Sequence, residues 1–258
     1  MLLLLAAFHF ASSLVLTPVP TSSPEELLRR SDVGALGPDS FRARLALRSG
    51  SPAASHEVEI WRSGDAKTLV RFLAPKERGR FLLRLENQLW LLTPGAKKPV
   101  RLSPSHRVYG GVRIDEVLGV RLAANYLVES ATEEQDDEGA LIVLELRARS
   151  EDLLFPEVRY VVRVATERPI SATYRLRSGR EATAVDFLQW HEGDLIYPSR
   201  VIVSDLLRKG SRTEIEVLEM EERPVPSELF ELDDPSARRA LDQPTGSFPE
   251  RLESTKVH

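Results

Sequence analysis

The side chains that could do acid–base or metal chemistry are few and scattered along the sequence. Five histidines are present, and their spacing does not match a metal site. They are His9, His56, His106, His191 and His258. His191 and Glu192 could act as an acid–base pair, but Leu195 stands where a His-Glu-x-x-His zinc motif needs its second histidine. The surrounding Gly193-Asp194 favours a solvated hairpin turn over a catalytic pair.

Other catalytic motifs are also missing from the sequence. There is no Gly-x-Ser-x-Gly nucleophile motif and no glycine-rich phosphate loop. The acidic run 133–138 lacks the ligand spacing of a calcium loop and is expected to form a solvated turn. There is no cysteine, which excludes disulfides, thiolate metal sites and cysteine nucleophiles. We therefore expect neither an enzyme nor a bound metal or cofactor.

The charge balance argues against polyanionic partners. The chain has 35 Lys and Arg residues against 39 Asp and Glu residues, which gives a formal net charge of −4 at pH 7. These charges are spread evenly, so no broad positive field is available to attract nucleic acid or an anionic membrane. We expect no nucleic-acid partner.

Most of the chain is patterned as short β-strands joined by turns. Phe41, Ala43, Leu45 and Leu47 alternate with mostly polar residues, which is typical of a strand with one wet face. The same period of two recurs between residues 57 and 102 and again between residues 141 and 220. The strand–helix alternation of a nucleotide-binding α/β fold is absent. The sequence predicts one mainly β domain, an antiparallel sheet of about 11–12 strands.

The N-terminal region is typical of an exported protein. An apolar run of about 15 residues, ending at Leu16, precedes Thr17-Pro18-Val19-Pro20; a membrane span needs roughly 20 residues. A retained anchor and a buried segment are the alternatives. Ser23-Pro24-Glu25-Glu26 then marks the start of a short helix. We expect a signal peptide at 1–20, a single β domain at 21–232 and a polar, partly disordered tail at 233–258.

The period of two is lost between Ser103 and Ala123. Gly110-Gly111 interrupts the segment, and Ile114, Val117 and Leu118 fall at helical spacing. We interpret residues 103–118 as a lid over an apolar face, with a plain surface crossover as the alternative. His106 and Arg107 on this lid could meet an anionic ligand, or could be ordinary surface residues.

Six short segments, taken in order, resemble the outer membrane lipoprotein-sorting proteins, which are similar to LolA-type periplasmic carriers. They are Arg71-Phe72-Leu73-Ala74-Pro75 with Gly79-Arg80, Gln88-Leu89-Trp90-Leu91, Val100-Arg101-Leu102-Ser103, Gly110-Gly111, Tyr197-Pro198-Ser199-Arg200 and Val225-Pro226-Ser227-Glu228-Leu229-Phe230. The resemblance covers residues 24 to 232. It implies an incomplete, strongly curved antiparallel β-barrel of the LolA/LolB type, with short helices forming a lid over an apolar cavity that takes acyl chains.

The candidate ligand-binding residues are the large apolar side chains of the strands and the lid. Phe81, Leu83 and Leu85 share one side of their strand, and we expect that side to face the cavity. The full set for the cavity wall is Phe72, Phe81, Leu83, Leu85, Trp90, Val117, Leu118, Tyr160 and Tyr174. The lid set is His106, Arg107, Gly110 and Gly111.

These observations together predict a monomeric periplasmic carrier. It would bind lipid or the acyl chains of lipoproteins and hand them toward the outer membrane, with an inner-membrane transporter as a further partner. The alternative is an accessory subunit that docks on an inner-membrane export pump and carries nothing. A small-molecule enzyme on the same scaffold would need polar groups that converge inside the cavity.

Export gives a first test. We expect the apolar stretch up to Leu16 to be cleaved off or left in the membrane, because its length suits a signal peptide. Edman sequencing of the protein from a periplasmic extract should then begin beyond Leu16. Soluble cytoplasmic protein that keeps the whole stretch would contradict export.

Overall fold

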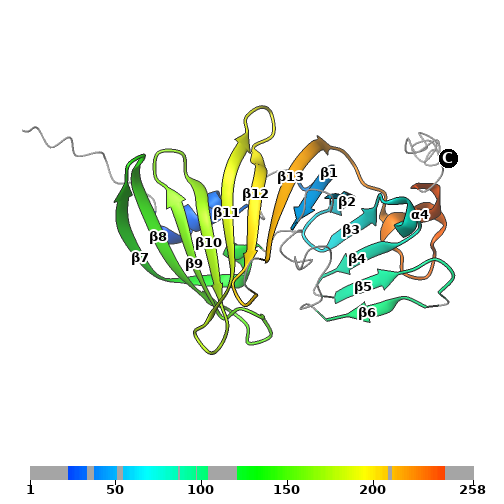
Figure 1. Cartoon of the computed structure of the whole chain (residues 1–258), viewed down its shortest axis with the longest axis horizontal. Helices are drawn as coiled ribbons and strands as arrows, with labels where there is room; N and C mark the ends of the chain where they lie inside the picture. The colour runs from blue at the N-terminus through cyan, green and yellow to red at the C-terminus, as the bar shows by residue number, and fades with distance from the viewer. Residues whose placement is uncertain are drawn as a thin grey trace, which may run out of the picture.

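The chain forms one antiparallel sheet of 13 strands in the computed structural model, which describes residues 23–33, 38–50, 55–86, 88–96, 98–103, 121–208 and 211–241. The strand order is β6-β5-β4-β3-β2-β1-β13-β12-β11-β10-β9-β8-β7. The strands are β1 (Ser40–Ser49), β2 (Ser55–Ser63), β3 (Lys67–Phe72), β4 (Phe81–Leu85), β5 (Gln88–Leu92), β6 (Val100–Leu102), β7 (Tyr126–Asp136), β8 (Gly139–Ala148), β9 (Glu157–Arg163), β10 (Arg168–Arg175), β11 (Glu181–His191), β12 (Tyr197–Asp205) and β13 (Ser211–Glu222). Two meanders, β1–β6 and β7–β13, therefore join where β1 pairs with β13 (Figure 1).

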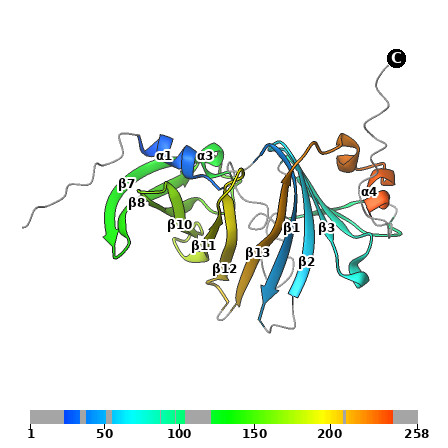
Figure 2. The same ribbon diagram turned by 90° about the horizontal axis from the view of Figure 1, so that it is seen from above.

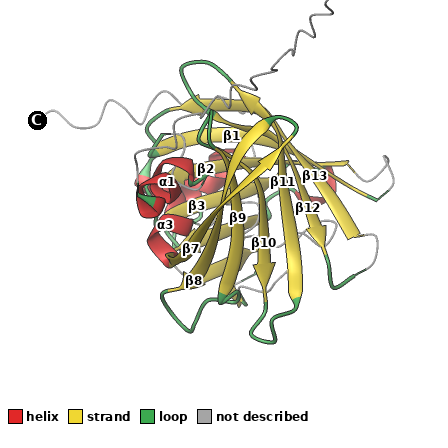
Figure 3. Ribbon diagram, turned by 90° about the vertical axis from the view of Figure 1, so that its left-hand side faces the viewer, coloured by secondary structure: helices red, strands yellow, loops and turns green. Residues whose placement is uncertain are grey.

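The sheet is strongly curved and remains open. Its end strands β6 and β7 do not pair with each other in the described part of the chain. Figure 2 shows the helices α1 (Pro24–Ser31) and α3 (Leu122–Asn125) beside β7 and β8, far from α4 (Ser236–Leu241). Figure 3 shows α1 and α3 lying together on one side of the strands. This architecture confirms the predicted fold class, an incomplete β-barrel with short helices.

Local sequence accounts for the first helix. Pro24 occupies its first turn, and the Ser23 hydroxyl accepts a hydrogen bond of 3.3 Å from the Glu26 backbone N–H. Both features satisfy or remove backbone donors that a helix start leaves unpaired. Leu27 and Leu28 are buried against the sheet. The 3-10 helices η1 (Pro75–Glu77) and η3 (Ser227–Phe230) complete the helical elements that the structure describes.

Three polar contacts hold α1 and α3 on the sheet. The hydroxyl of Tyr160, on β9, donates a hydrogen bond of 2.5 Å to the backbone oxygen of Ser31. Asp32 accepts a hydrogen bond of 2.9 Å from the Ala123 backbone N–H. Arg121, before α3, forms an ion pair with Asp65 of the β2–β3 turn. Burial, together with the charge of Asp32, raises the pKa of Tyr160 well above its usual range, so its hydroxyl stays a donor.

The sheet has two differently covered faces. The inner face is the face that carries α1 and α3, and its buried residues form one apolar cluster that runs from β1–β5 to β7–β13. The outer face carries a smaller buried apolar cluster under the C-terminal segment 225–241. Its members are Trp61, Leu69, Phe81, Leu83, Leu229, Phe230 and Leu241. Both faces of β3–β5 are thus apolar.

The structure corrects one sequence-based expectation about an element end. Glu133–Asp136 belong to β7 rather than to a solvated turn, because they pair with Gly139–Ile142 of β8. Arg163 holds the actual turn by ion pairs with Asp136 and Glu138. The helix α4 lies within the range expected to be a partly disordered tail, and its Leu241 is buried in the outer cluster.

Tyr160 gives a test of how the helices are held. Tyr160→Phe leaves the Ser31 carbonyl without its donor and is expected to lower the free energy of unfolding by about 1–3 kcal/mol. Urea denaturation measures the loss. Tyr197→Phe is the matched control, because Tyr197 is partly exposed and should change stability by less than about 0.5 kcal/mol. Equal effects of the two changes would contradict the role of the Tyr160 bond.

Candidate functional site

The inner face is only partly covered in the described part of the chain. Its residues on β8 and β9, next to α1 and α3, are almost fully buried; Leu144 and Val158 have no exposed surface. Elsewhere on this face, buried side chains such as Leu45 and Val58 lie beside others that are only half-buried. This half-buried wall consists of Leu91, Leu102, Phe187, Val201, Val217 and Met220. A half-buried apolar wall on a curved sheet is a surface that can take an apolar ligand.

A β-bulge lets β13 contribute two residues to this wall. Val217 lies opposite Leu45 on β1, and Met220 lies opposite Ala43. Val217 and Met220 are three positions apart, so a regular strand would place them on opposite faces. The register shifts at Leu218, so the extra residue restores the alternation and both side chains point to the inner face. Leu218 itself is 43% exposed.

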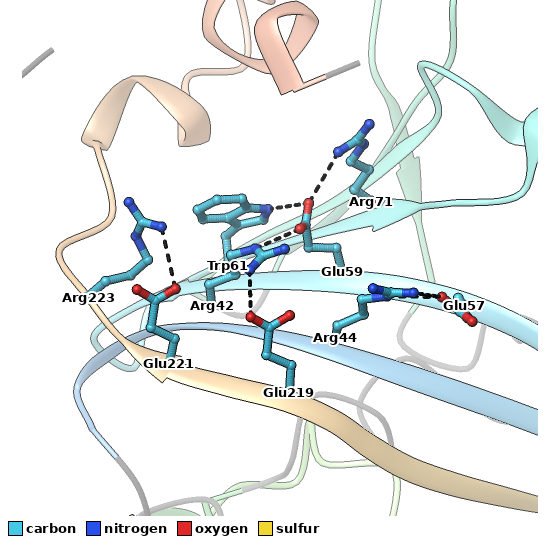
Figure 4. Close-up of polar contacts among 9 residues, drawn as sticks. All are labelled: Arg42, Arg44, Glu57, Glu59, Trp61, Arg71, Glu219, Glu221 and Arg223. Atoms are coloured by element: carbon cyan, nitrogen blue, oxygen red, sulfur yellow. Dashed lines mark hydrogen bonds and ion pairs between the residues drawn. The ribbon is translucent and has the colours of Figure 1, made fainter. Parts of the chain in front are cut away.

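The outer face of the same central strands is charged. Glu59 is 5% exposed and accepts hydrogen bonds from Arg42 Nε at 2.7 Å, Trp61 Nε1 at 3.2 Å and Arg71 Nη1 at 3.3 Å (Figure 4). The guanidinium of Arg42 lies 5.7 Å from the Trp61 ring centroid, and that of Arg223 lies 5.8 Å from it. Breaking such a desolvated network is costly, so an apolar chain is excluded from this part of the sheet.

The predicted cavity wall is divided between the two faces. Phe72, Tyr160 and Tyr174 lie on the inner face, where Tyr174 is half-buried and its ring centroid lies 5.3 Å from that of Phe155. Four other residues of the predicted wall lie on the opposite face. Phe81, Leu83, Leu85 and Trp90 lie on the outer face under the segment 225–241. Their strands β4 and β5 are apolar on both sides, so alternation alone does not tell the inner side from the outer one.

The remaining predicted residues lie outside the described residues. They are the wall residues Val117 and Leu118 and the lid residues His106, Arg107, Gly110 and Gly111. The lid therefore stays a prediction. Sequence reasoning missed most of the half-buried wall, including Phe187, Val217 and Met220. The one available signal was the period of two, and the bulge at Leu218 interrupts it.

The candidate acid–base pair, His191 and Glu192, is exposed and engaged in other contacts. His191 is exposed at the end of β11, where its ring stacks on Tyr197 with centroids 4.7 Å apart. Glu192 accepts a hydrogen bond of 2.7 Å from Arg168, which lowers the pKa of Glu192 and keeps it ionised. An ionised carboxylate paired in this way is a poor proton donor. Among the residues that the structure describes, no three His, Cys, Asp or Glu side chains are placed to hold a metal ion.

Comparison with known proteins agrees with this geometry. A family model described as "Uncharacterized protein" matches residues 64–234, about two thirds of the chain. The chain belongs to this family. No curated protein matches the sequence.

Three solved structures show that this chain has a LolA-like fold. The LolA superfamily protein NE2245 from Nitrosomonas europaea has a TM-score of 0.74 at 24% identity, over 83% of this chain and 99% of that one. An outer membrane lipoprotein-sorting protein domain from Vibrio parahaemolyticus has 0.67 at 14% identity, over 85% and 98%. A DUF1329 family protein from Desulfovibrio piger has 0.65 at 17% identity, over 80% and 95%. None of these three descriptions names an enzyme. Within the described residues, no helix has the length and apolar character that a membrane span requires.

Mutations on the two faces should have different effects on stability and on ligand binding. Leu83 is fully buried in the outer cluster, so Leu83→Ala is expected to lower the free energy of unfolding by about 2–5 kcal/mol and to leave apolar ligand binding at the inner face intact. Tyr174→Ala removes a half-buried side chain and should cost about 1–2 kcal/mol while weakening that binding. Urea denaturation and titration with a fluorescent fatty-acyl probe measure the two effects. The assignment of faces fails if Leu83→Ala weakens probe binding and Tyr174→Ala does not.

Proposed function

We propose that this protein is a periplasmic carrier that binds lipid, or the acyl chains of lipoproteins, on its inner face and delivers them toward the outer membrane. The observation that carries the proposal is the half-buried apolar wall on the inner face of an open sheet. The LolA fold and the sorting-protein domain among its structural neighbours support the same function.

The physics of the wall suits an acyl chain better than a polar ligand. Each methylene group removed from water contributes about 0.8 kcal/mol, and this contribution needs no directional partner. The wall residues Phe187, Val217 and Met220 are neutral, and the charged network around Glu59 lies on the opposite face. Met220 also adapts its shape readily, because its side chain is unbranched and flexible. A surface of this kind binds chains of different lengths without selecting a precise polar geometry.

Partners follow from the same proposal. A carrier of this type works as a monomer, because an inner face paired with a second copy would be closed to cargo. It would receive cargo from an inner-membrane transporter and release it at the outer membrane. The docking-subunit alternative predicts a binding surface without cargo. The charged outer face of β1 and β2 supports it less well, because Arg42 and Arg44 are already paired with Glu59 and Glu57.

The wall itself gives the test of this function. The double change Val217→Thr and Met220→Gln keeps the side-chain shapes but places two polar groups on the inner face. We expect it to weaken binding of a fluorescent fatty-acyl probe by about tenfold or more, which corresponds to about 1.4 kcal/mol. Fluorescence titration gives the dissociation constants, and thermal melts establish that the variant is folded.

Leu218→Gln is the matched control for this test. Leu218 lies in the same strand, between the two wall residues, but is not part of the inner cluster. It should bind the probe as the unchanged protein does. A folded double variant with undiminished binding would rule out the inner face as the cargo site and favour the docking subunit.

A further inference from the structure

A pocket lies on the outer face, away from the proposed cargo wall. It has a volume of about 670 Å³ and lies between β4–β5, the β5–β6 connection and the C-terminal segment. Its apolar wall includes Phe81, Trp90, Leu92 and Pro94. This volume lies within the range of small-molecule sites. The inner face takes no part in it, because the side chains of Phe81 and Trp90 point to the opposite side of the sheet.

The charges around this pocket are unbalanced. Lys98, Arg238 and Arg239 line it, against the single acidic residue Asp233. Lys98 and Arg239 are exposed at the rim, whereas Arg238 is only 2% exposed. The pocket therefore combines an apolar wall with a cationic side, which is complementary to an anion on an apolar body.

Arg238 is the most unusual of these groups. Its Nη1 donates to the backbone oxygens of Leu229, at 3.1 Å, and of Glu231. No carboxylate of the described chain forms an ion pair with it; those of Asp234 and Glu231 act on its charge only at longer range. Burial lowers the pKa of Arg238, which shows that its charge is poorly solvated. A buried cation without a direct counter-ion is costly, and a carboxylate in the adjoining pocket would relieve that cost.

Trp90 supplies a second unused donor. Its indole Nε1–H is buried and has no hydrogen-bond partner among the described residues. Buried polar groups in proteins are nearly always paired, so an unpaired indole N–H beside a pocket points to an acceptor inside that pocket. A bound acceptor would satisfy this donor.

We propose that this outer pocket binds a small amphiphile with a carboxylate head, such as a medium-chain fatty acid. Its carboxylate is held by Arg238 with Lys98 and Arg239, and its chain lies along Phe81, Trp90 and Leu92. A peptide carrying a C-terminal carboxylate fits less well. An extended peptide gains affinity from a free strand edge, and β4 and β5 are each paired on both sides.

Isothermal titration with decanoate tests the proposal on the full chain, with 1-decanol as the uncharged probe. We expect one decanoate per protein and at least about tenfold weaker binding of decanol, because the charge-assisted bonds are lost. The double change Lys98→Gln and Arg239→Gln alters exposed residues only and should weaken decanoate binding by about tenfold. Trp90→Phe should weaken it by about threefold, and Arg238→Gln should weaken it further wherever that variant folds.

Matched controls distinguish binding in this pocket from a general effect of charge and from binding on the inner face. Lys76→Gln with Arg208→Gln removes the same two charge types from exposed positions outside the pocket and should leave binding unchanged. The inner-face change Val217→Thr with Met220→Gln should also leave decanoate binding unchanged. The outer-pocket proposal and the carrier proposal can therefore be contradicted independently. Equal affinity for decanol and decanoate would overturn the proposal. So would an equal loss of decanoate affinity in the pocket charge variant and the control charge variant. A loss of decanoate affinity in the inner-face variant alone would overturn it as well. Binding of a peptide with a free C-terminus in place of decanoate would overturn it in favour of a peptide site.

Discussion

A sheet that stays open must bury an apolar face without a closing strand, and that constraint governs the rest of this structure. A closed barrel would fill its interior with its own side chains. Here the helices that the structure describes on the inner face, α1 and α3, have only eight and four residues, and part of the apolar face stays half-buried. Tyr160 fixes this cover by its bond to Ser31, and the rest of the wall, around Val217 and Met220, stays half-buried.

The two faces of the central strands differ in their chemistry. On the outer face, Glu59 gathers Arg42, Trp61 and Arg71 into a desolvated network that fixes β1–β3 relative to one another. On the inner face, the same strands present mostly apolar side chains, with Arg62 over the ring of Phe41 as a charged exception. Directional bonds thus hold the strands together on one face, and in the proposed function the apolar surface of the other face binds cargo. The proposed carrier function depends on this separation.

The sequence was sufficient for the architecture but not for the site. Alternation along β1, hairpin-length links and the Ser23-Pro24 helix start predicted the sheet and α1 correctly, because these features are local. Local sequence does not decide which side of β4 and β5 belongs to the inner face. Phe81, Leu83 and Trp90 were assigned to the cavity, yet residues 225–241, distant in sequence, cover them on the outer face. The bulge at Leu218 and the packing of α4 are likewise set by tertiary contacts that the period of two does not contain.

The most direct test of the central claim is native mass spectrometry of the protein isolated from the cell envelope without detergent. If the inner face carries acyl chains, part of the protein should carry additional masses that correspond to lipid or an acylated peptide and dissociate on collisional activation. Protein that shows only its own mass under conditions that preserve non-covalent lipid complexes would contradict the carrier account.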